Sequence, residues 1–321
     1  MAARDAAQCT RVREISAQAA RELDQWARRY PLIRRVRVWP LAMSVAAAAP
    51  FSSVRAVVSS ARVSLWVFTL DDVFDEELVQ ADELMRQAEC YKAIVSNGLT
   101  VTMDDSLAAA LCEVRDDLAR YPLFGALGRE WAAALCGTID GMIREYEWGL
   151  SYRQRADFVL PSYEEYVANG LYSIGGPPHV WAALVTNDDP STSRHVEHLR
   201  SMERIASTCV RLANDLKSCD KEVSEGKINS LVILSHALCR GGLPPGKALM
   251  RAKALVQAHI ADGLDQLGEL QRAAHTRTGR PEAMVADIAR FVCEFYSRHD
   301  YHTFLLEAGA RPVPSPFQGE G

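Results

Sequence analysis

Long stretches of the chain carry apolar residues at three- and four-residue spacing, which is the pattern of amphipathic helices. No Asn-Gly or Asp-Gly pair stands between two alternating strand patterns, so β-hairpins are not expected. The clearest helical segments are residues 106–121, 130–150, 194–225 and 247–274. The pattern therefore predicts an all-α protein.

Prolines and a GGLPPG turn separate the helical segments by short connections, and no repeat of fixed period is present. The first stretch rich in Pro and Gly is RPVPSPFQGEG, at the end of the sequence. We expect one helical domain over residues 36–308, with an N-terminal helical segment at 1–35 and a disordered tail at 309–321.

The helical pattern between residues 164 and 184 is interrupted by Gly170 and by the GGPP run at 175–178. Ser162, with Glu165 three residues later, predicts a capping box at the start of this segment. Because Gly and Pro both interrupt helices, the segment is either one bent or split helix or two helices joined by a loop.

The composition is that of an ordinary soluble protein of 321 residues, with 48% hydrophobic residues, 24% charged residues and a formal net charge of −5. The arginines are scattered, so no nucleic-acid partner is expected. Eight cysteines without a CxxC pair are expected to be reduced thiols. Neither a signal peptide nor a stretch long enough to span a membrane is recognisable, so we expect a cytoplasmic location.

An acidic cluster follows an apolar run in LWVFTLDDVFDEE. If residues 54–77 form a helix, Asp71 and Asp75 lie one turn apart, with Asp72 beside them. Clustered carboxylates repel one another, and they are ligands that Mg²⁺ prefers. The alternative is a solvated helix end. The other Asp pairs of the chain lack a carboxylate three positions later, so only this pair completes a DDxxD pattern.

A second group of oxygen ligands occurs in NDLKSCDKE, where Asn214, Ser218 and Glu222 recur at four-residue spacing. They therefore share one face of a helix over two turns. An amide, a hydroxyl and a carboxylate can bind a hard divalent cation, although a polar helix surface would show the same spacing.

Together, DDxxD and (N/D)DxxSxxxE resemble the motifs of class I terpene synthases of the bacterial single-domain type, over roughly residues 40 to 305. SYEEYVANGLYSIGG and RLANDLKSCDKE are similar to bacterial diterpene synthases related to kaurene synthase. The resemblance implies a single-domain helical bundle that binds three Mg²⁺ ions, with Mn²⁺ as an alternative. It assigns Asp71 and Asp75 as ligands of two ions, and Asn214, Ser218 and Glu222 as ligands of the third. It also makes Asp72 a catalytic residue.

The same resemblance implies a site for the substrate's diphosphate group. It assigns diphosphate binding to Arg211, Lys221, Arg298 and Tyr301, although the last two are not adjacent as they are in the family. The diphosphate-sensing arginine of many bacterial sesquiterpene synthases is missing from residues 167–170. Tyr172, Ile174 and Gly175 are expected beside the reacting carbons.

Aromatic residues are expected to line an apolar pocket below the metals, because aromatic faces stabilise a carbocation. Trp66 and Phe68 precede the acidic cluster by one or two turns. Further candidates are Trp148, Tyr172, Trp181, Phe295 and Tyr296, any of which could instead be core residues.

We therefore expect a carbon–oxygen lyase that converts geranylgeranyl diphosphate, or a bicyclic diterpenyl diphosphate, to a terpene. The alternative is a sesquiterpene cyclase acting on farnesyl diphosphate. A chain-elongating prenyltransferase would carry a second DDxxD, which is absent, and a non-catalytic helical binding protein would show damaged motifs. His299 and Asp300 suggest an HD phosphohydrolase, but no further ligand set accompanies them. The sequence leaves open whether the chain forms a homodimer.

Overall fold

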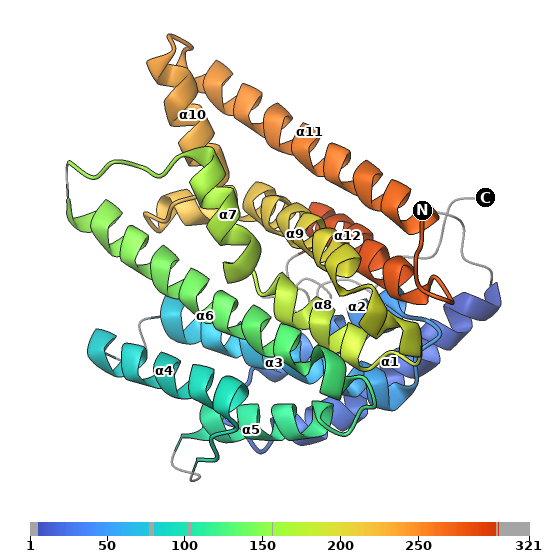
Figure 1. Ribbon diagram of the computed structural model, residues 1–321. Helices are drawn as coiled ribbons and strands as arrows, with labels where there is room; N and C mark the ends of the chain where they lie inside the picture. Colours follow the sequence, from blue (N-terminus) through green and yellow to red (C-terminus); the bar gives the residue numbers. More distant parts are fainter. Residues whose placement is uncertain (1–5, 77–79, 102–104, 156, 300, 302–321) are drawn as a thin grey trace.

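The computed structural model describes residues 6–76, 80–101, 105–155, 157–299 and 301 (Figure 1). Over these residues the chain forms twelve α-helices and two short 3-10 helices, with no strand, which confirms the predicted all-α fold. The α-helices are α1 Ala6–Ala27, α2 Val38–Ala48, α3 Val54–Asp75, α4 Ala81–Asn97, α5 Ser106–Leu118, α6 Phe124–Gln154, α7 Tyr163–Ser173, α8 Gly176–Val185, α9 Val196–Ser224, α10 Ser230–Arg240, α11 Pro245–Arg272 and α12 Arg280–Arg298. The 3-10 helices are Arg35–Arg37 and Pro190–Arg194. The tail predicted at 309–321 lies outside the described residues.

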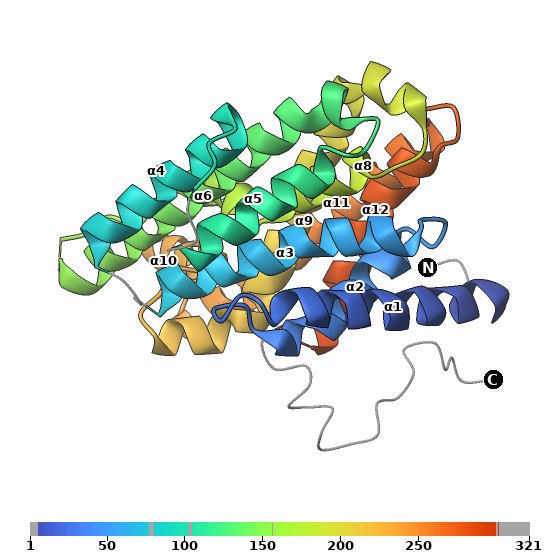
Figure 2. The same ribbon diagram turned by 90° about the horizontal axis from the view of Figure 1, so that it is seen from below.

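Helix α8 lies inside the bundle, where α3, α6, α7, α9 and α12 pack around it (Figure 2). Its residues are buried except at Gly176 and His179. A helix with neighbours on all sides must be apolar around its whole circumference, and the sequence PPHVWAALV meets that requirement. The core therefore forms around α8.

The Gly- and Pro-rich interruption splits its segment into two helices, since α7 ends at Ser173 and α8 begins at Gly176. Gly175 has a φ of +73°, and an added Cβ would lie 2.3 Å from Val67 Cγ1. A residue with a side chain would therefore be strained both in its backbone and against α3. The predicted capping box between Ser162 and Glu165 is present at the start of α7.

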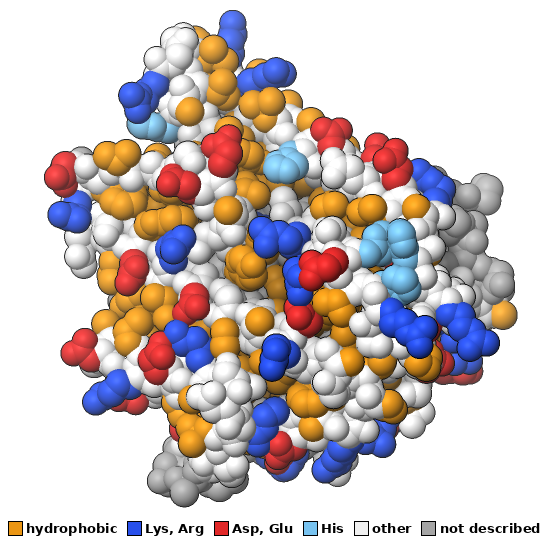
Figure 3. All heavy atoms as spheres, viewed as in Figure 1, with side chains coloured by type: hydrophobic (Ala, Val, Ile, Leu, Met, Phe, Trp, Pro, Cys, Tyr) orange, Lys and Arg blue, Asp and Glu red, His pale blue; other side chains and the backbone are white. Residues whose placement is uncertain are grey.

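The remaining helices cover this core. Helix α1 packs on α2 and α3, while α4 and α5 cover α6 and α3, and α10 and α11 pack on α9. Acidic and basic side chains are interspersed over the face drawn in Figure 3. Within the described part of the chain, no helix combines the length and the hydropathy that a membrane-spanning segment needs.

Candidate active site

A cavity opens between the C-terminal parts of α3, α6, α9 and α12, with the end of α7 on one side. Its larger apolar lining residues are Val67, Phe68, Phe74, Met142, Tyr146, Trp148, Ile174, Ile228 and Tyr296. Its charged lining residues are Asp71, Asp75, Glu145, Arg153, Arg211, Lys221, Glu222, Glu225 and Lys227. The cavity thus combines a charged set and an apolar set of side chains.

The first predicted metal motif lies at the C-terminal end of α3. Asp71 and Asp75 both line the cavity, together with Val67 one turn earlier. Burial raises the pKa of Asp71 well above its usual value, and the negative charges of Asp75 and Asp72 raise it further. A helix C-terminus also disfavours negative charge. Cations would therefore stabilise this pair of carboxylates.

Asp72, expected from the resemblance to be catalytic, is not among the residues that line the cavity. Its carboxylate accepts two hydrogen bonds from buried Arg37, at 2.6 and 2.7 Å, and lies 3.3 Å from Arg34 Nε. Successive residues of a helix point about 100° apart, so Asp72 leaves the face that Asp71 occupies. Asp72 is thus an ion-pair partner between α3 and the segment before α2.

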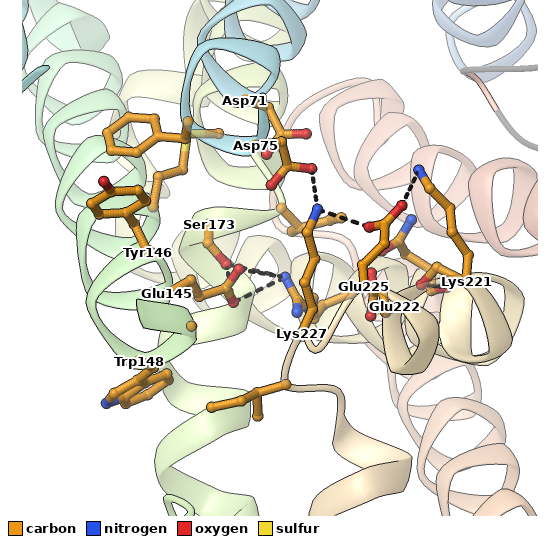
Figure 4. A pocket seen from close by; sticks show the side chains of 18 of the residues that line it. Asp71, Asp75, Glu145, Tyr146, Trp148, Ser173, Lys221, Glu222, Glu225 and Lys227 are labelled. Atoms are coloured by element: carbon orange, nitrogen blue, oxygen red, sulfur yellow. Dashed lines mark hydrogen bonds and ion pairs between the residues drawn. The ribbon is translucent and has the colours of Figure 1, made fainter. Parts of the chain in front are cut away.

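The second predicted motif lies on α9, where Asn214, Ser218 and Glu222 all line the same cavity. Figure 4 shows Asp71 and Asp75 on one side of it and Glu222 on the other. Burial raises the pKa of Glu222 to about 7, and the nearby charge of Asp215 adds to the shift. The two motifs, far apart in the sequence, therefore meet across one cavity.

The described residues contain no group of three or more His, Cys, Asp or Glu side chains placed to hold a metal ion by themselves. The candidate ligands instead form two incomplete sets of oxygen atoms, a carboxylate pair on α3 and an amide, hydroxyl and carboxylate on α9. Hard divalent cations accept such oxygens and commonly complete their coordination with substrate phosphates. The donor set fits Mg²⁺ or Mn²⁺ bound together with a diphosphate.

Arg211 lines the cavity as expected, but its guanidinium is already paired. It lies 2.9 Å from Asp215 and 3.0 Å from Glu145, and it donates to the Tyr166 hydroxyl. An added Cβ at Gly170 would lie 2.9 Å from Arg211 Cγ, so the glycine on α7 leaves room for this side chain. Arg211 therefore joins α6, α7 and α9 in the wall of the cavity.

Two lysines reach the charged side of the cavity. Lys221, expected from the sequence, lies 3.8 Å from Glu225. Lys227 was not expected as a site residue, and its Nζ lies 2.7 Å from Asp75 Oδ2 and 3.3 Å from Glu225 Oε2 (Figure 4). Both amines lie where an anionic substrate group could meet them.

The structure does not bring Arg298 and Tyr301 to the cavity. Arg298 lies 3.7 Å from Glu294, on its own helix. Tyr301 is buried, its hydroxyl shares a 2.6 Å hydrogen bond with Ser44, and its ring stacks on Phe295. The chain leaves α12 in an extended conformation at His299, which separates the two side chains.

Of the aromatic residues expected in the pocket, Phe68, Trp148 and Tyr296 line it. Trp66 is fully buried elsewhere, where its Nε1 donates to the Leu107 carbonyl at 2.8 Å. It lies five residues before Asp71 and so points to another side of α3.

The other residues expected in or beside the pocket differ in their positions. Trp181 and Phe295 are core residues outside the cavity lining. The Tyr172 hydroxyl accepts a hydrogen bond from Arg204 at 3.3 Å, away from the cavity. Ile174 lines the cavity, and Gly175 packs on Val67 beside it.

Sequence reasoning missed Glu145, Tyr146, Arg153, Glu225 and Lys227 as site residues. The first three lie on α6, in a helix whose pattern shows no motif. Glu225 and Lys227 belong to a polar stretch directly after the second metal motif, and that position was the one signal available for them.

An all-α bundle in which Asp71 and Asp75 of a DDxxD motif face the oxygens of an NDxxSxxxE motif across one partly apolar cavity defines a class I terpene synthase. The chain belongs to terpene synthase family 2, since the model of its C-terminal metal-binding region matches residues 62–262.

Curated relatives include terpene synthase 6 and kaurene synthase like 2, both chloroplastic proteins of Isodon rubescens. They are 27% and 26% identical over 76% and 86% of this chain. The chain spans only 36% of the length of each.

The fold is also that of solved structures. Linalool/nerolidol synthase from Streptomyces clavuligerus, in complex with 2-fluorogeranyl diphosphate, aligns with a TM-score of 0.68 over 88% of this chain and 94% of that one, at 20% identity. Hedycaryol synthase aligns with a TM-score of 0.63 at 18% identity, over 92% of this chain and 93% of that one.

Proposed function

We propose that the protein is a Mg²⁺-dependent lyase that ionises an allylic prenyl diphosphate and converts the carbocation to a terpene, releasing diphosphate. The observation that carries this proposal is the meeting of Asp71 and Asp75 with Asn214, Ser218 and Glu222 around a cavity whose lining also includes a set of apolar side chains. A site that only bound metal would not need the apolar part.

The charged residues bind and orient the substrate's diphosphate. Asp71, Asp75, Asn214, Ser218 and Glu222 would hold divalent cations through oxygen atoms. Bound there, such cations would neutralise the diphosphate and make it a better leaving group. Lys221, which lines the same cavity, attracts the departing group, which takes the electron pair of the broken C–O bond. Arg211, paired with Glu145 and Asp215, adds positive charge to the cavity wall.

The apolar residues protect the carbocation from water. Phe68, Phe74, Met142, Ile174 and Tyr296 present hydrocarbon surface beyond the metal ligands. Excluding water prevents early quenching of the cation, and each aromatic face near the charge stabilises it by about 0.5–2 kcal/mol. These side chains direct the carbocation toward rearrangement or ring closure.

We infer a C20 substrate, geranylgeranyl diphosphate or a bicyclic diterpenyl diphosphate. The support is the similarity to relatives named for diterpene chemistry, among them kaurene synthase like 2 and an ent-atiserene synthase of Isodon japonicus, 26% identical over 61% of this chain. The second candidate is farnesyl diphosphate, because the titles of the structural neighbours name linalool/nerolidol and hedycaryol synthases.

The test is incubation of the purified protein with each diphosphate and Mg²⁺, followed by gas chromatography and mass spectrometry. We expect a C20 hydrocarbon or alcohol, and none after addition of EDTA. Products from farnesyl diphosphate alone would move the assignment to a sesquiterpene synthase. Absence of product from every diphosphate would overturn it.

Variants connect the activity to the site. Asp71→Ala and Asn214→Ala should each abolish product formation while the helical circular-dichroism signal is kept. Asp188→Ala is the matched control, because Asp188 is an exposed member of another Asp pair, 3.4 Å from Arg280 and outside the cavity. It should retain full activity.

A further inference from the structure

Lys227 is the basic residue that joins the two halves of the charged site. Its ammonium group lies 2.7 Å from Asp75 on α3 and 3.3 Å from Glu225, which follows α9 (Figure 4). Asp75 is one of the two carboxylates that the α3 motif offers to a cation. Lys227 therefore forms an ion pair with the carboxylate of Asp75.

The backbone after α9 holds Lys227 in place. Gly226 takes up a φ of +67°, which lets the amide of Lys227 donate to the carbonyl of Glu222 at 2.9 Å. The Asn229 side chain donates to the Glu222 carboxylate at 2.7 Å. The lysine is thus positioned by the same helix end that carries the second metal motif.

Charge balance decides what Lys227 does when cations bind. Asp71, Asp75, Glu222 and Glu225 place four carboxyl groups around this part of the cavity, and the Lys227 ammonium group compensates negative charge on Asp75 and Glu225. A divalent cation on Asp75 competes for the same oxygen atoms and repels the ammonium group. The ammonium group then needs another acceptor, and a diphosphate held between α3 and α9 lies within reach of this residue.

We propose that Lys227 is an exchangeable ligand: it neutralises Asp75 in the metal-free protein and passes to the substrate's diphosphate when divalent cations take Asp75. This inference rests on the proposed function, because it requires a diphosphate in the cavity. It assigns two effects to Lys227. Its ion pair with Asp75 weakens the affinity for the metal, and its contact with the diphosphate strengthens the affinity for the anion.

The experiment is titration calorimetry on the full chain with two probes, Mn²⁺ alone and pyrophosphate in the presence of Mg²⁺. Lys227→Met should bind Mn²⁺ alone about five-fold more tightly, because a competing ion pair of about 1 kcal/mol is removed. The same variant should bind pyrophosphate about ten-fold more weakly, because a charge-assisted hydrogen bond is lost.

Two further variants make the result specific. Lys217→Met is the matched control, since Lys217 is exposed on α9, donates to the Arg298 carbonyl at 3.3 Å and lies outside the cavity lining. It should leave both affinities unchanged. Lys227→Arg keeps the charge and should restore most of the pyrophosphate affinity.

The opposite shifts in Lys227→Met distinguish the proposal from a structural role. Weakening of both affinities would mean that Lys227 only holds the loop, and an unchanged pyrophosphate affinity would mean that it never reaches the anion; either result overturns the proposal. Product formation by the unmodified protein is measured in parallel. If that protein forms product but the opposite shifts are missing, this inference fails and the proposed function stands; if it neither forms product nor binds pyrophosphate with Mg²⁺, the proposed function fails.

Discussion

Asp71 and Asp72 are adjacent in the sequence, but their carboxylates have different partners. Asp72 pairs with Arg37, and the side chains are only 7% and 1% exposed. Removing one charge of a buried pair leaves the other uncompensated, at a cost of about 3 kcal/mol. We expect Asp72→Asn to lower the free energy of unfolding of the metal-free protein by about that amount, measured by urea denaturation.

Asp71→Asn is the matched comparison. The pKa of Asp71 is raised, which means that its ionised form is disfavoured in the metal-free fold. Its replacement should therefore leave stability unchanged or raise it, while abolishing product formation. If both variants were destabilised equally, the separate environments inferred for the two carboxylates would be wrong.

Glu203 on α9 is a buried carboxylate about three helical turns before Asn214 and outside the cavity lining, and it predicts a pH dependence of stability. Burial raises its pKa from 4.5 to about 7, although Ser207 donates to it at 2.9 Å. A carboxylate with a raised folded-state pKa contributes stability that is present below pH 4.5 and is lost as pH rises through about 7.

We expect Glu203→Gln to be more stable than the unmodified protein at pH 8, by about 3 kcal/mol at most, and equally stable near pH 4. The amide keeps an acceptor for Ser207 and removes the buried charge. Chemical denaturation at both pH values measures the difference. A gain of the same size at both would contradict titration of Glu203 as its cause.

Residue spacing along one helix predicts only part of the site. Asp71 and Asp75 could be predicted to share a face because they lie one turn apart on one helix. The pairing of Asp72 with Arg37, and of Lys227 with Asp75, joins positions 35 and 152 residues apart, and no local spacing encodes such contacts. Tyr301 was expected to bind the diphosphate, but the chain is extended at His299 after α12, and the sequence did not predict this conformation.

At the scale of the elements, the joint between α7 and α8 positions Ile174 at the cavity. The Gly and Pro run predicted an interruption but could not distinguish a bent helix from two helices. The structure has two helices with Ile174 and Gly175 between them. At the joint, Gly175 has a φ of +73° and approaches Val67 on α3 closely, and this tertiary contact cannot be predicted from local spacing.

This joint predicts the effect of Gly175→Ala. Alanine would have to adopt a φ of +73° with its Cβ 2.3 Å from Val67 Cγ1, so we expect a loss of about 2 kcal/mol in the free energy of unfolding. Val67 lines the cavity, so its displacement should also change the product distribution. Unfolding experiments and product analysis measure the two effects.

Gly125→Ala is the control for that substitution. Gly125 lies in the first turn of α6, and nothing lies within 4 Å of an added Cβ there. Its replacement should leave stability unchanged or slightly raised, because alanine favours helix more than glycine does. A Gly175→Ala protein as stable as this control would show that the joint tolerates a side chain.

At the scale of the whole molecule, the site exists because the bundle brings the ends of α3 and α9 together. Both helices pack on α8, which fixes their relative position from inside the core. The motifs could be predicted from the sequence, and so could the helical class. That they face each other depended on the order in which the helices pack around α8, which helix periodicity does not specify.

This arrangement predicts that metal and anion stabilise the molecule together. Mg²⁺ with pyrophosphate should connect the oxygen ligands of α3 with those of α9, and at a hundred-fold excess over Kd the gain in unfolding free energy is about 2.7 kcal/mol. Either component alone should give much less, because each ligand set is incomplete by itself.

Thermal unfolding with Mg²⁺, pyrophosphate, both, or both with EDTA measures the gain in unfolding free energy. Hydrogen exchange should show protection at the end of α3 and at residues 225–229. In Asp71→Ala and Asn214→Ala the joint gain should disappear. An equal gain from Mg²⁺ alone, or an undiminished gain in either variant, would show that the two motifs do not act as one site.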